Sequence, residues 1–305
     1  MYFNEDTHLA WMPGGKVEII SFDPDTGGRF FIEEPPEEPG EKVRFVHSGR
    51  CFGCHGGSAT NFLPGPLARS HFTSETGRRL GSVSGHIRLG HKVPFQDRWG
   101  GYSVTGAPKT LKHLGNVFAS RNEKREVLLD TVRDRSKDSL SDYFEPEKFP
   151  RGDSNVVPLL LLDHQIEGHN LIMEARYRQR HLDYQTEKKG KPESSAQRSA
   201  DSLFERLTRY LLFKEEASLA GHRINRHPEF EEDFRANRKT TADGLSLKDL
   251  SLNGRLMEHR LSYLIQSRPF LESPQNMKDQ IYNRLWAILS PITNEFRTCR
   301  GIGNT

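Results

Sequence analysis

Two cysteines three residues apart, followed at once by a histidine, constrain this chain more than any other feature: Cys51-Phe52-Gly53-Cys54-His55. This is the spacing of covalent c-type haem attachment. The two thiols can form thioethers with the haem vinyl groups, and the adjacent imidazole is placed to ligate the iron. We therefore expect one covalently attached haem c per chain, bound through Cys51 and Cys54 with His55 as the proximal iron ligand.

Two other kinds of site use a Cys-x-x-Cys pair. A structural zinc site usually needs four Cys or His ligands, and the only other cysteine in the sequence is Cys299. A thioredoxin-like dithiol needs a strand-to-helix setting, whereas Gly56-Gly57-Ser58 follows the motif and favours a turn. Both alternatives stay open, but haem attachment is the interpretation that the motif favours.

The composition is that of a chain with a large polar surface. Apolar residues make up 34% of 305 and charged residues 28%, with a mean hydropathy of −0.72. No apolar run approaches the length of a membrane span. The formal net charge is +3 and positive and negative residues are interspersed, so nothing indicates a nucleic-acid-binding face.

The motif also predicts where the protein works, because haem is normally attached covalently outside the cytoplasm. We therefore expect an exported, periplasmic or equivalent, location. The first residues, Met1 to Asp6, have neither the basic start nor the apolar core of a signal peptide. The expectation is thus that a leader precedes the sequence given.

The chain divides into a β-rich and loop-rich region, residues 1–121, and a helical region, 122–305, with an α+β fold in which both pack around a loop-built haem pocket. Residues 17–22 and 29–32 predict a hairpin across the turn-forming residues 23–28, and 43–47 a further strand. Residues 56–120, rich in Gly, Pro, Ser and His, are typical of loops that build a cofactor pocket.

The helical region is led by a long apolar helix predicted over residues 156–181, with Asp153-Ser154 as its cap. Residues 185–198 are polar and predict an exposed link. Two further helices are indicated by apolar residues at helical spacing, Leu203, Phe204, Leu207, Tyr210 and Leu211 in one and Ile281, Leu285, Trp286 and Leu289 in the other.

The second axial ligand of the iron decides the chemistry, and histidine is the best candidate because no methionine occurs between His55 and Met173. His164 and His169 lie on the long helix, where five residues of separation project them about 140° apart. Only one of them can face the iron. We prefer His164, which shares a helix face with Gly168, and place His169 second. The alternative is that both are hydrogen-bonded core histidines.

Other polar residues are candidates for the haem pocket. Arg69 and Arg98 could pair with the haem propionates or form ordinary surface pairs, and Trp99 and Tyr102 could line the pocket edge. His113 is a further distal candidate. The remaining histidine pairs, His86/His91 and His222/His227, have loop-like or polar surroundings and are expected either at the surface or as groups that contact and support the pocket residues.

Several segments resemble a family of bacterial proteins described only as cytochrome c domain-containing. They are Tyr2 to Asp6, Trp11 to Gly15, Cys51 to His55 with Pro64 to Ser70, Arg98 to Gly101, His113 to Asn116, His164-Gln165 and His169 to Ile172. The resemblance covers most of the chain and implies an exported haem protein without implying an activity. This chain departs from the family after Gly101, where relatives continue with a histidine that is missing here.

Two classes of function follow from these features. The first is an exported monohaem c-type cytochrome that passes electrons to or from a redox partner protein. The second is a haem enzyme, peroxidase-like or oxygenase-like, or a haem-based sensor, with an open or His-lined distal side. The length of the chain favours the second class, since an electron carrier needs only about 100 residues.

Overall fold

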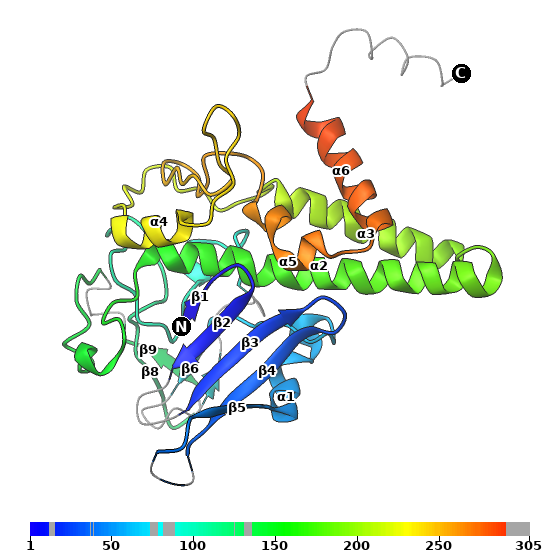
Figure 1. Cartoon of the computed structure of the whole chain (residues 1–305). Coiled ribbons are helices and arrows are strands. Elements are labelled where there is room, and N and C mark those ends of the chain that lie inside the picture. Colours follow the sequence, from blue (N-terminus) through cyan, green and yellow to red (C-terminus); the bar gives the residue numbers. More distant parts are fainter. Residues whose placement is uncertain are drawn as a thin grey trace.

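The N-terminal part of the chain forms one antiparallel sheet in which each strand pairs with the next (Figure 1). Its strands are β1 (Tyr2–Phe3), β2 (Thr7–Trp11), β3 (Val17–Asp23), β4 (Gly27–Glu34) and β5 (Arg44–His47). The computed structural model describes residues 1–11, 16–36, 38, 40–73, 79–81, 89–124, 126–130 and 136–290. The predicted hairpin and third strand are confirmed as β3, β4 and β5.

The turn between β3 and β4 is fixed by the side chain of Asp23. Its Oδ1 accepts hydrogen bonds from the backbone N–H groups of Asp25 and Thr26, at 3.0 and 2.8 Å. Gly27 then adopts a φ of +87°, which a residue without a Cβ reaches at little cost. The turn sets the register of the hairpin, in which Phe22 pairs with Gly28 and Ile20 with Phe30.

The long helix is longer than the sequence pattern predicts: α2 runs from Val156 to Lys189. Asn155 rather than Asp153 or Ser154 caps it, because the Asn155 Oδ1 accepts from the Val157 N–H at 2.9 Å. Gly190 ends the helix in the left-handed conformation, with a φ of +75°. The predicted exposed link over 185–198 is therefore wrong, since most of it belongs to α2 and the next helix.

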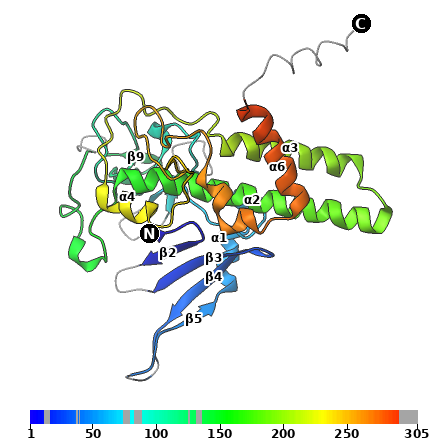
Figure 2. The ribbon, with the colours of Figure 1, turned by 45° about the horizontal axis from the view of Figure 1, so that its top comes forward.

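The helical layer packs on α2 and supplies most of the apolar core. Its other members are α3 (Ser194–Leu211), α4 (Pro228–Arg235), α5 (Arg268–Leu271) and α6 (Gln275–Leu289). Figure 2 shows α3 running beside α2, α6 crossing them, and the sheet on the other side of α2. One core cluster joins Ala68 and Trp99 of the loop region to α2, α3 and α6. The two regions expected from sequence thus share a core.

The helical part begins later than predicted. The strands β8 (Ala119–Arg121) and β9 (Val127–Leu129) and a short 3-10 helix at Pro146–Lys148 occupy the described residues before α2. Residues 212–262 are loops apart from α4. Pro146, Pro150 and Gly152 explain part of this difference, because proline and glycine disfavour a continuous helix.

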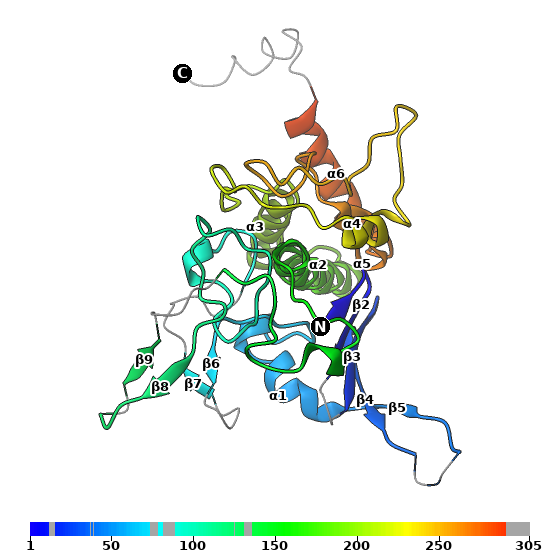
Figure 3. The ribbon, with the colours of Figure 1, turned by 90° about the vertical axis from the view of Figure 1, so that its left-hand side faces the viewer.

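The segment Cys51 to His55 lies between the sheet and the loop region. Figure 3, which looks along α2, shows the helical turn α1 (Phe52–His55) with the sheet on one side and the small hairpins β6–β7 (Phe72–Thr73, Arg79–Gly81) and β8–β9 on the other. Among the described residues, no helix is both long enough and apolar enough to cross a membrane. The expected α+β architecture is confirmed, with an N-terminal β layer and a helical C-terminal half.

Candidate functional site

The motif residues share one face of a short helical segment. Cys51 ends a 3-10 helix (Gly49–Cys51) that continues directly into α1, and Cys51 and Phe52 both have right-handed helical dihedrals. Residues i, i+3 and i+4 of a helix lie on the same face, so Cys51, Cys54 and His55 point to one side. Cys51 is half-buried, Cys54 is exposed, and both are free thiols. Cys299 lies outside the described residues.

The imidazole of His55 is oriented by a backbone carbonyl. Its Nδ1 lies 3.0 Å from the carbonyl oxygen of Gly65. Because a carbonyl only accepts, this bond places the proton on Nδ1 and leaves the lone pair on Nε2. Among the described residues, no hydrogen bond engages Nε2. Burial is the main cause that lowers the pKa of His55; the hydrogen bond to Gly65 and the charge of Glu18 oppose it, and the nearby Arg69 adds to it. The lowered pKa favours the neutral ring, the state that ligates a metal.

The loop after the motif ties His55 to the middle of α2. The Gly65 N–H donates to the His55 carbonyl at 3.0 Å, and the Asn170 amide donates to the Pro66 carbonyl at 2.9 Å. A Cβ on Gly65 would lie 2.0 Å from Oδ1 of Asn170, so glycine allows this close approach. Asn61 and Glu174 add a second link at 2.6 Å. The motif is thus held against the segment of α2 that carries His169.

His169 is fully buried and neither of its ring nitrogens has a hydrogen-bond partner among the described residues. Its ring packs against Phe22 at 4.2 Å and against His8 at 5.8 Å, between ring centroids. Burial, followed by the proximity of His8, holds the pKa of His169 well below its usual range. Two unsatisfied nitrogens in a buried ring are costly and call for an explanation.

One face of the sheet contacts both His55 and His169. The register pairs His8 with Ile20 and Ile20 with Phe30, so these side chains and that of Phe22 project from the same face. Phe30 packs on His55 at 5.1 Å, whereas Phe22 packs on His169. The sequence analysis missed His8 and Phe22; the alternation along their strands could have placed them on an inward face.

His164 has a different setting, and the structure does not support the preference for it as axial ligand. Its Nδ1 lies 2.7 Å from Nδ1 of His91, and its Nε2 lies 2.7 Å from the Ser262 hydroxyl. The ring is parallel to Tyr210 at 5.1 Å and stacks on Phe213 at 4.3 Å. Both nitrogens are engaged in the core between helices, as expected for a core histidine.

The prediction for Gly168 is wrong: it does not open space for a haem edge, because a Cβ there would lie 2.3 Å from Cδ1 of Leu264, which occupies that space. Of the two alternatives for His91, the surface position is excluded, since the residue is 2% exposed and stacks on Tyr210 at 4.0 Å. Its hydrogen bond to His164 fits the other alternative, a group that supports a candidate residue. His86, the predicted pair of His91, lies outside the described residues.

Arg98 and Trp99 are core residues rather than pocket residues. Arg98 donates to the carbonyls of Val93 and His91, each at 2.7 Å, and to Asp163 at 3.3 Å. The Trp99 indole N–H donates to the same Asp163 oxygen at 3.0 Å. Both side chains are almost fully buried, so their polar groups serve to hold Asp163 of α2. Neither has an unpartnered side-chain nitrogen to donate to a propionate.

Arg69 keeps such a donor. Its Nε is buried without a hydrogen-bond partner, and its charge acts on the pKa of His55. His113, the remaining distal candidate, is buried with its Nδ1 accepting from the Gly115 N–H at 3.0 Å and its ring 5.5 Å from Trp99. Of the predicted residues, the structure therefore groups Cys51, Cys54, His55 and Arg69, and places His169 across the same sheet face.

Among the residues that the structure describes, no three His, Cys, Asp or Glu side chains form a metal-ligand group. Haem iron requires less of the protein, because the porphyrin supplies four ligands and one imidazole completes a proximal side. No family model, curated protein or solved structure matches the chain.

Proposed function

We propose that this chain is an exported monohaem c-type cytochrome that functions in electron transfer. Cys51 and Cys54 bind the haem through thioethers, and Nε2 of His55 ligates the iron. The observation that carries the proposal is the arrangement of these three side chains on one helical face, with the His55 Nδ1 hydrogen-bonded to the Gly65 carbonyl. Such a bond to the second ring nitrogen fixes the orientation and tautomer of a metal-ligating histidine.

His169 is the proposed distal ligand. It is supported by its two unpartnered nitrogens, by its complete burial, and by the docking of the motif loop at the neighbouring Asn170. Bound haem would supply a one-electron iron couple, and two imidazole ligands favour a low potential and electron transfer. Arg69, with its unpartnered Nε, is the residue proposed to pair with a propionate.

A redox partner protein would approach the exposed side of the motif. Cys54 and the flanking Phe52 and Phe62 are all exposed, with Phe62 at 75%. Exposed aromatic side chains next to a redox centre are typical of an interaction surface. The exported location follows from covalent attachment, which normally takes place outside the cytoplasm.

The second candidate is a haem enzyme or sensor whose distal side stays open. It is favoured by His8, which lies beside His169 and has an Nδ1 without a partner among the described residues. Two neighbouring imidazoles could exchange protons with a distal substrate. Carbon monoxide separates the two candidates, because it binds reduced haem that has an open face.

The proposal is tested by producing the chain with a leader in a host that attaches haem to c-type cytochromes. Mass spectrometry and the pyridine haemochrome spectrum should show two thioethers in the parent, one in Cys51→Ser or Cys54→Ser, and no covalent haem in the double variant. Cys299→Ser is the control and should keep both thioethers. Covalent haem in the double variant, or a parent that never acquires haem, would refute the proposal.

The distal assignment has its own test in the haem-loaded protein. His169→Ala should shift the Soret band and admit carbon monoxide, whereas His164→Ala should leave the iron ligands unchanged. Binding of carbon monoxide by the parent would favour the enzyme or sensor. A spectrum insensitive to His169→Ala would remove His169 as the ligand.

A further inference from the structure

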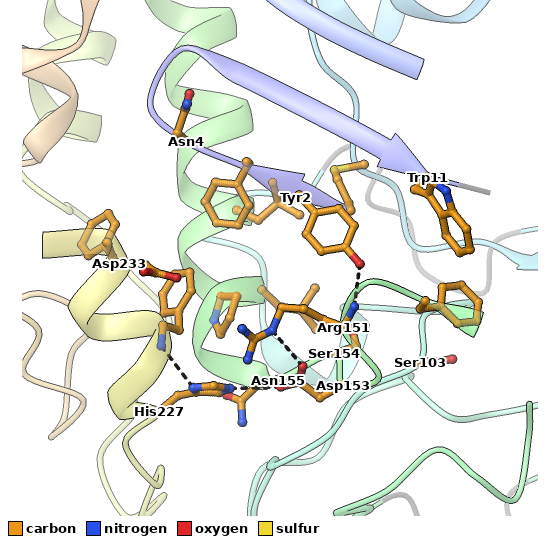
Figure 4. Close-up of a pocket in the computed structure, with 18 of the residues that line it drawn as sticks. Tyr2, Asn4, Trp11, Ser103, Arg151, Asp153, Ser154, Asn155, His227 and Asp233 are labelled. Atoms are coloured by element: carbon orange, nitrogen blue, oxygen red, sulfur yellow. Dashed lines mark hydrogen bonds and ion pairs between the residues drawn. The ribbon is translucent and has the colours of Figure 1, made fainter. Parts of the chain in front are cut away.

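A cavity of about 660 Å³ lies apart from the proposed haem site (Figure 4). Its walls come from β1, β2, the first turns of α2, the loop before α2, and α4. The described residues that line it do not include Cys51, Cys54, His55 or His169. Its volume is within the range of about 300–1,000 Å³ that is typical of small-molecule sites.

The cavity is lined by two groups of aromatic side chains. Phe230 contacts Phe3 at 6.3 Å and Phe234 at 6.0 Å, between ring centroids. On the other side, Phe149 lies 5.3 Å from Trp11 and packs on a further phenylalanine. Tyr2 lies between the two groups, with Trp11 on one side of it and Asp233 on the other (Figure 4). These rings offer a ligand apolar faces on which an aromatic compound can stack.

The arginine and lysine side chains that line the cavity are paired with carboxylates of the protein itself. Arg151 binds Glu229 through both terminal nitrogens, at 3.0 and 2.9 Å, and Asp153 through Nε at 3.3 Å. Lys248 is ion-paired with Glu5 and donates to the Phe234 carbonyl at 2.8 Å. Within the described residues, neither cation is left to bind an anion, so a carboxylate or phosphate ligand is disfavoured.

A polar group available to a ligand between the two aromatic groups is the hydroxyl of Tyr2; Ser103 and Asp233 also line the cavity. The Tyr2 hydroxyl accepts the backbone N–H of Arg151 at 3.1 Å, as the dashed line in Figure 4 shows. Its own proton has no acceptor among the described residues. The hydroxyl can therefore donate to an oxygen atom of a bound molecule, and it does so between the two aromatic groups.

We propose that this cavity binds an uncharged aromatic compound that carries a hydroxyl or carbonyl oxygen, of the phenol or quinone class. The aromatic walls hold the rings and the Tyr2 hydroxyl donates to the oxygen. Because the Arg151 and Lys248 side chains are already paired with carboxylates, the site selects against acidic analogues. This binding does not depend on haem attachment.

The test measures binding by calorimetry with three probes, 1-naphthol, naphthalene and 1-naphthoate, to the full chain. We expect 1-naphthol to bind at least tenfold more tightly than 1-naphthoate. Tyr2→Phe should weaken 1-naphthol by about 2- to 10-fold, the value of one hydrogen bond, and leave naphthalene unchanged. Phe230→Ala should weaken both, whereas Trp286→Ala, at a side chain that is 76% exposed, should change neither.

The outcomes separate this proposal from the haem assignment. The affinity should be the same in the Cys51→Ser/Cys54→Ser double variant, whether or not the parent carries haem. Circular dichroism checks that each variant is folded. If Phe230→Ala does not fold, the conservative variant Tyr2→Phe still tests the proposal. Absence of saturable 1-naphthol binding, equal affinity for 1-naphthoate, or an unchanged 1-naphthol affinity in Tyr2→Phe would each overturn the proposal.

Discussion

The two buried histidines of α2 have opposite surroundings. His164 faces the helices and the loop around His91, and both of its ring nitrogens are hydrogen-bonded. His169 faces the sheet, and neither nitrogen has a partner among the described residues. Since proteins satisfy nearly all buried polar groups, the first setting is that of a structural residue, whereas the second supports the proposal that another group completes the site.

The largest change in the free energy of unfolding is expected at Asp163, whose carboxylate forms a buried ion pair with Arg98 on the helix-facing side of α2. Removing its carboxylate in Asp163→Ala leaves the guanidinium of Arg98 buried without its counter-charge and should cost about 3–5 kcal/mol of unfolding free energy. Glu215→Ala is the control, because its ion pairs with Lys92 and Arg209 are exposed and should contribute less than about 1 kcal/mol. Urea unfolding measures both. If Asp163→Ala and Glu215→Ala lost the same unfolding free energy, the buried pair of Asp163 and Arg98 would not be a determinant of stability.

The histidines themselves give the sharpest contrast. In the haem-free double cysteine variant, His164→Leu should destabilise the fold by about 2–4 kcal/mol, because it strands the His91 Nδ1 and the Ser262 hydroxyl in the core. His169→Leu should leave stability unchanged or raise it, because it removes two unsatisfied nitrogens. Guanidinium unfolding measures the difference. If both variants lost the same stability, the contrast between the two faces would be wrong.

The sequence was sufficient for the parts of the site that depend on local geometry. One helical turn brings together Cys51, Cys54 and His55. The hairpin is predicted by turn-forming residues between two segments with alternating apolar residues. The choice between His164 and His169 was not local, because it depends on which face of α2 meets the sheet. The prediction based on Gly168 was wrong for the same reason. The space beside this glycine is filled by Leu264, which comes from a distant part of the chain.

The residue that caps α2 and the ion-pair partner of Arg98 could not be predicted from the sequence pattern either. Asn155 caps α2 although Asp153 and Ser154 are equally good capping types, because Asp153 is engaged with Arg151 and His227. Arg98 was predicted to bind a propionate or to form a surface pair, yet the loop folds it onto the buried Asp163. In both cases, the deciding partner comes from packing rather than from neighbouring residues.

The pH dependence of the free energy of unfolding should depend on His91, which contacts His164 on the helix-facing side of α2. Burial, followed by the charge of Arg98, lowers the pKa of His91 to about 3, below its value of about 6.5 in an unfolded chain. The unfolded state therefore takes up a proton first as pH falls, so the stabilisation is present above about pH 6.5 and is lost toward pH 3. Between about pH 7 and pH 5, His91 should account for a loss of about 2 kcal/mol.

His91→Gln should reduce this loss by that amount, as followed by urea unfolding at the two pH values. His47→Gln, at an exposed position of β5, is the control and should keep the parental pH dependence. A pH dependence in His91→Gln equal to that of the parent would show that the imidazole is not buried as a neutral group.

The smallest change in the free energy of unfolding is expected from a single hydrogen bond, the one between Ser262 and His164. The Ser262 hydroxyl lies 2.7 Å from Nε2 of His164 and accepts the Leu264 N–H at 3.2 Å. Ser262→Ala should therefore cost about 1–2 kcal/mol, the value of one buried hydrogen bond and one capping interaction. Ser218→Ala is the control, since that side chain is exposed. Because the Ser262 bond lies on the opposite side of α2 from His169, the haem spectrum should stay unchanged; a shifted spectrum would mean that His164, and not His169, reaches the iron.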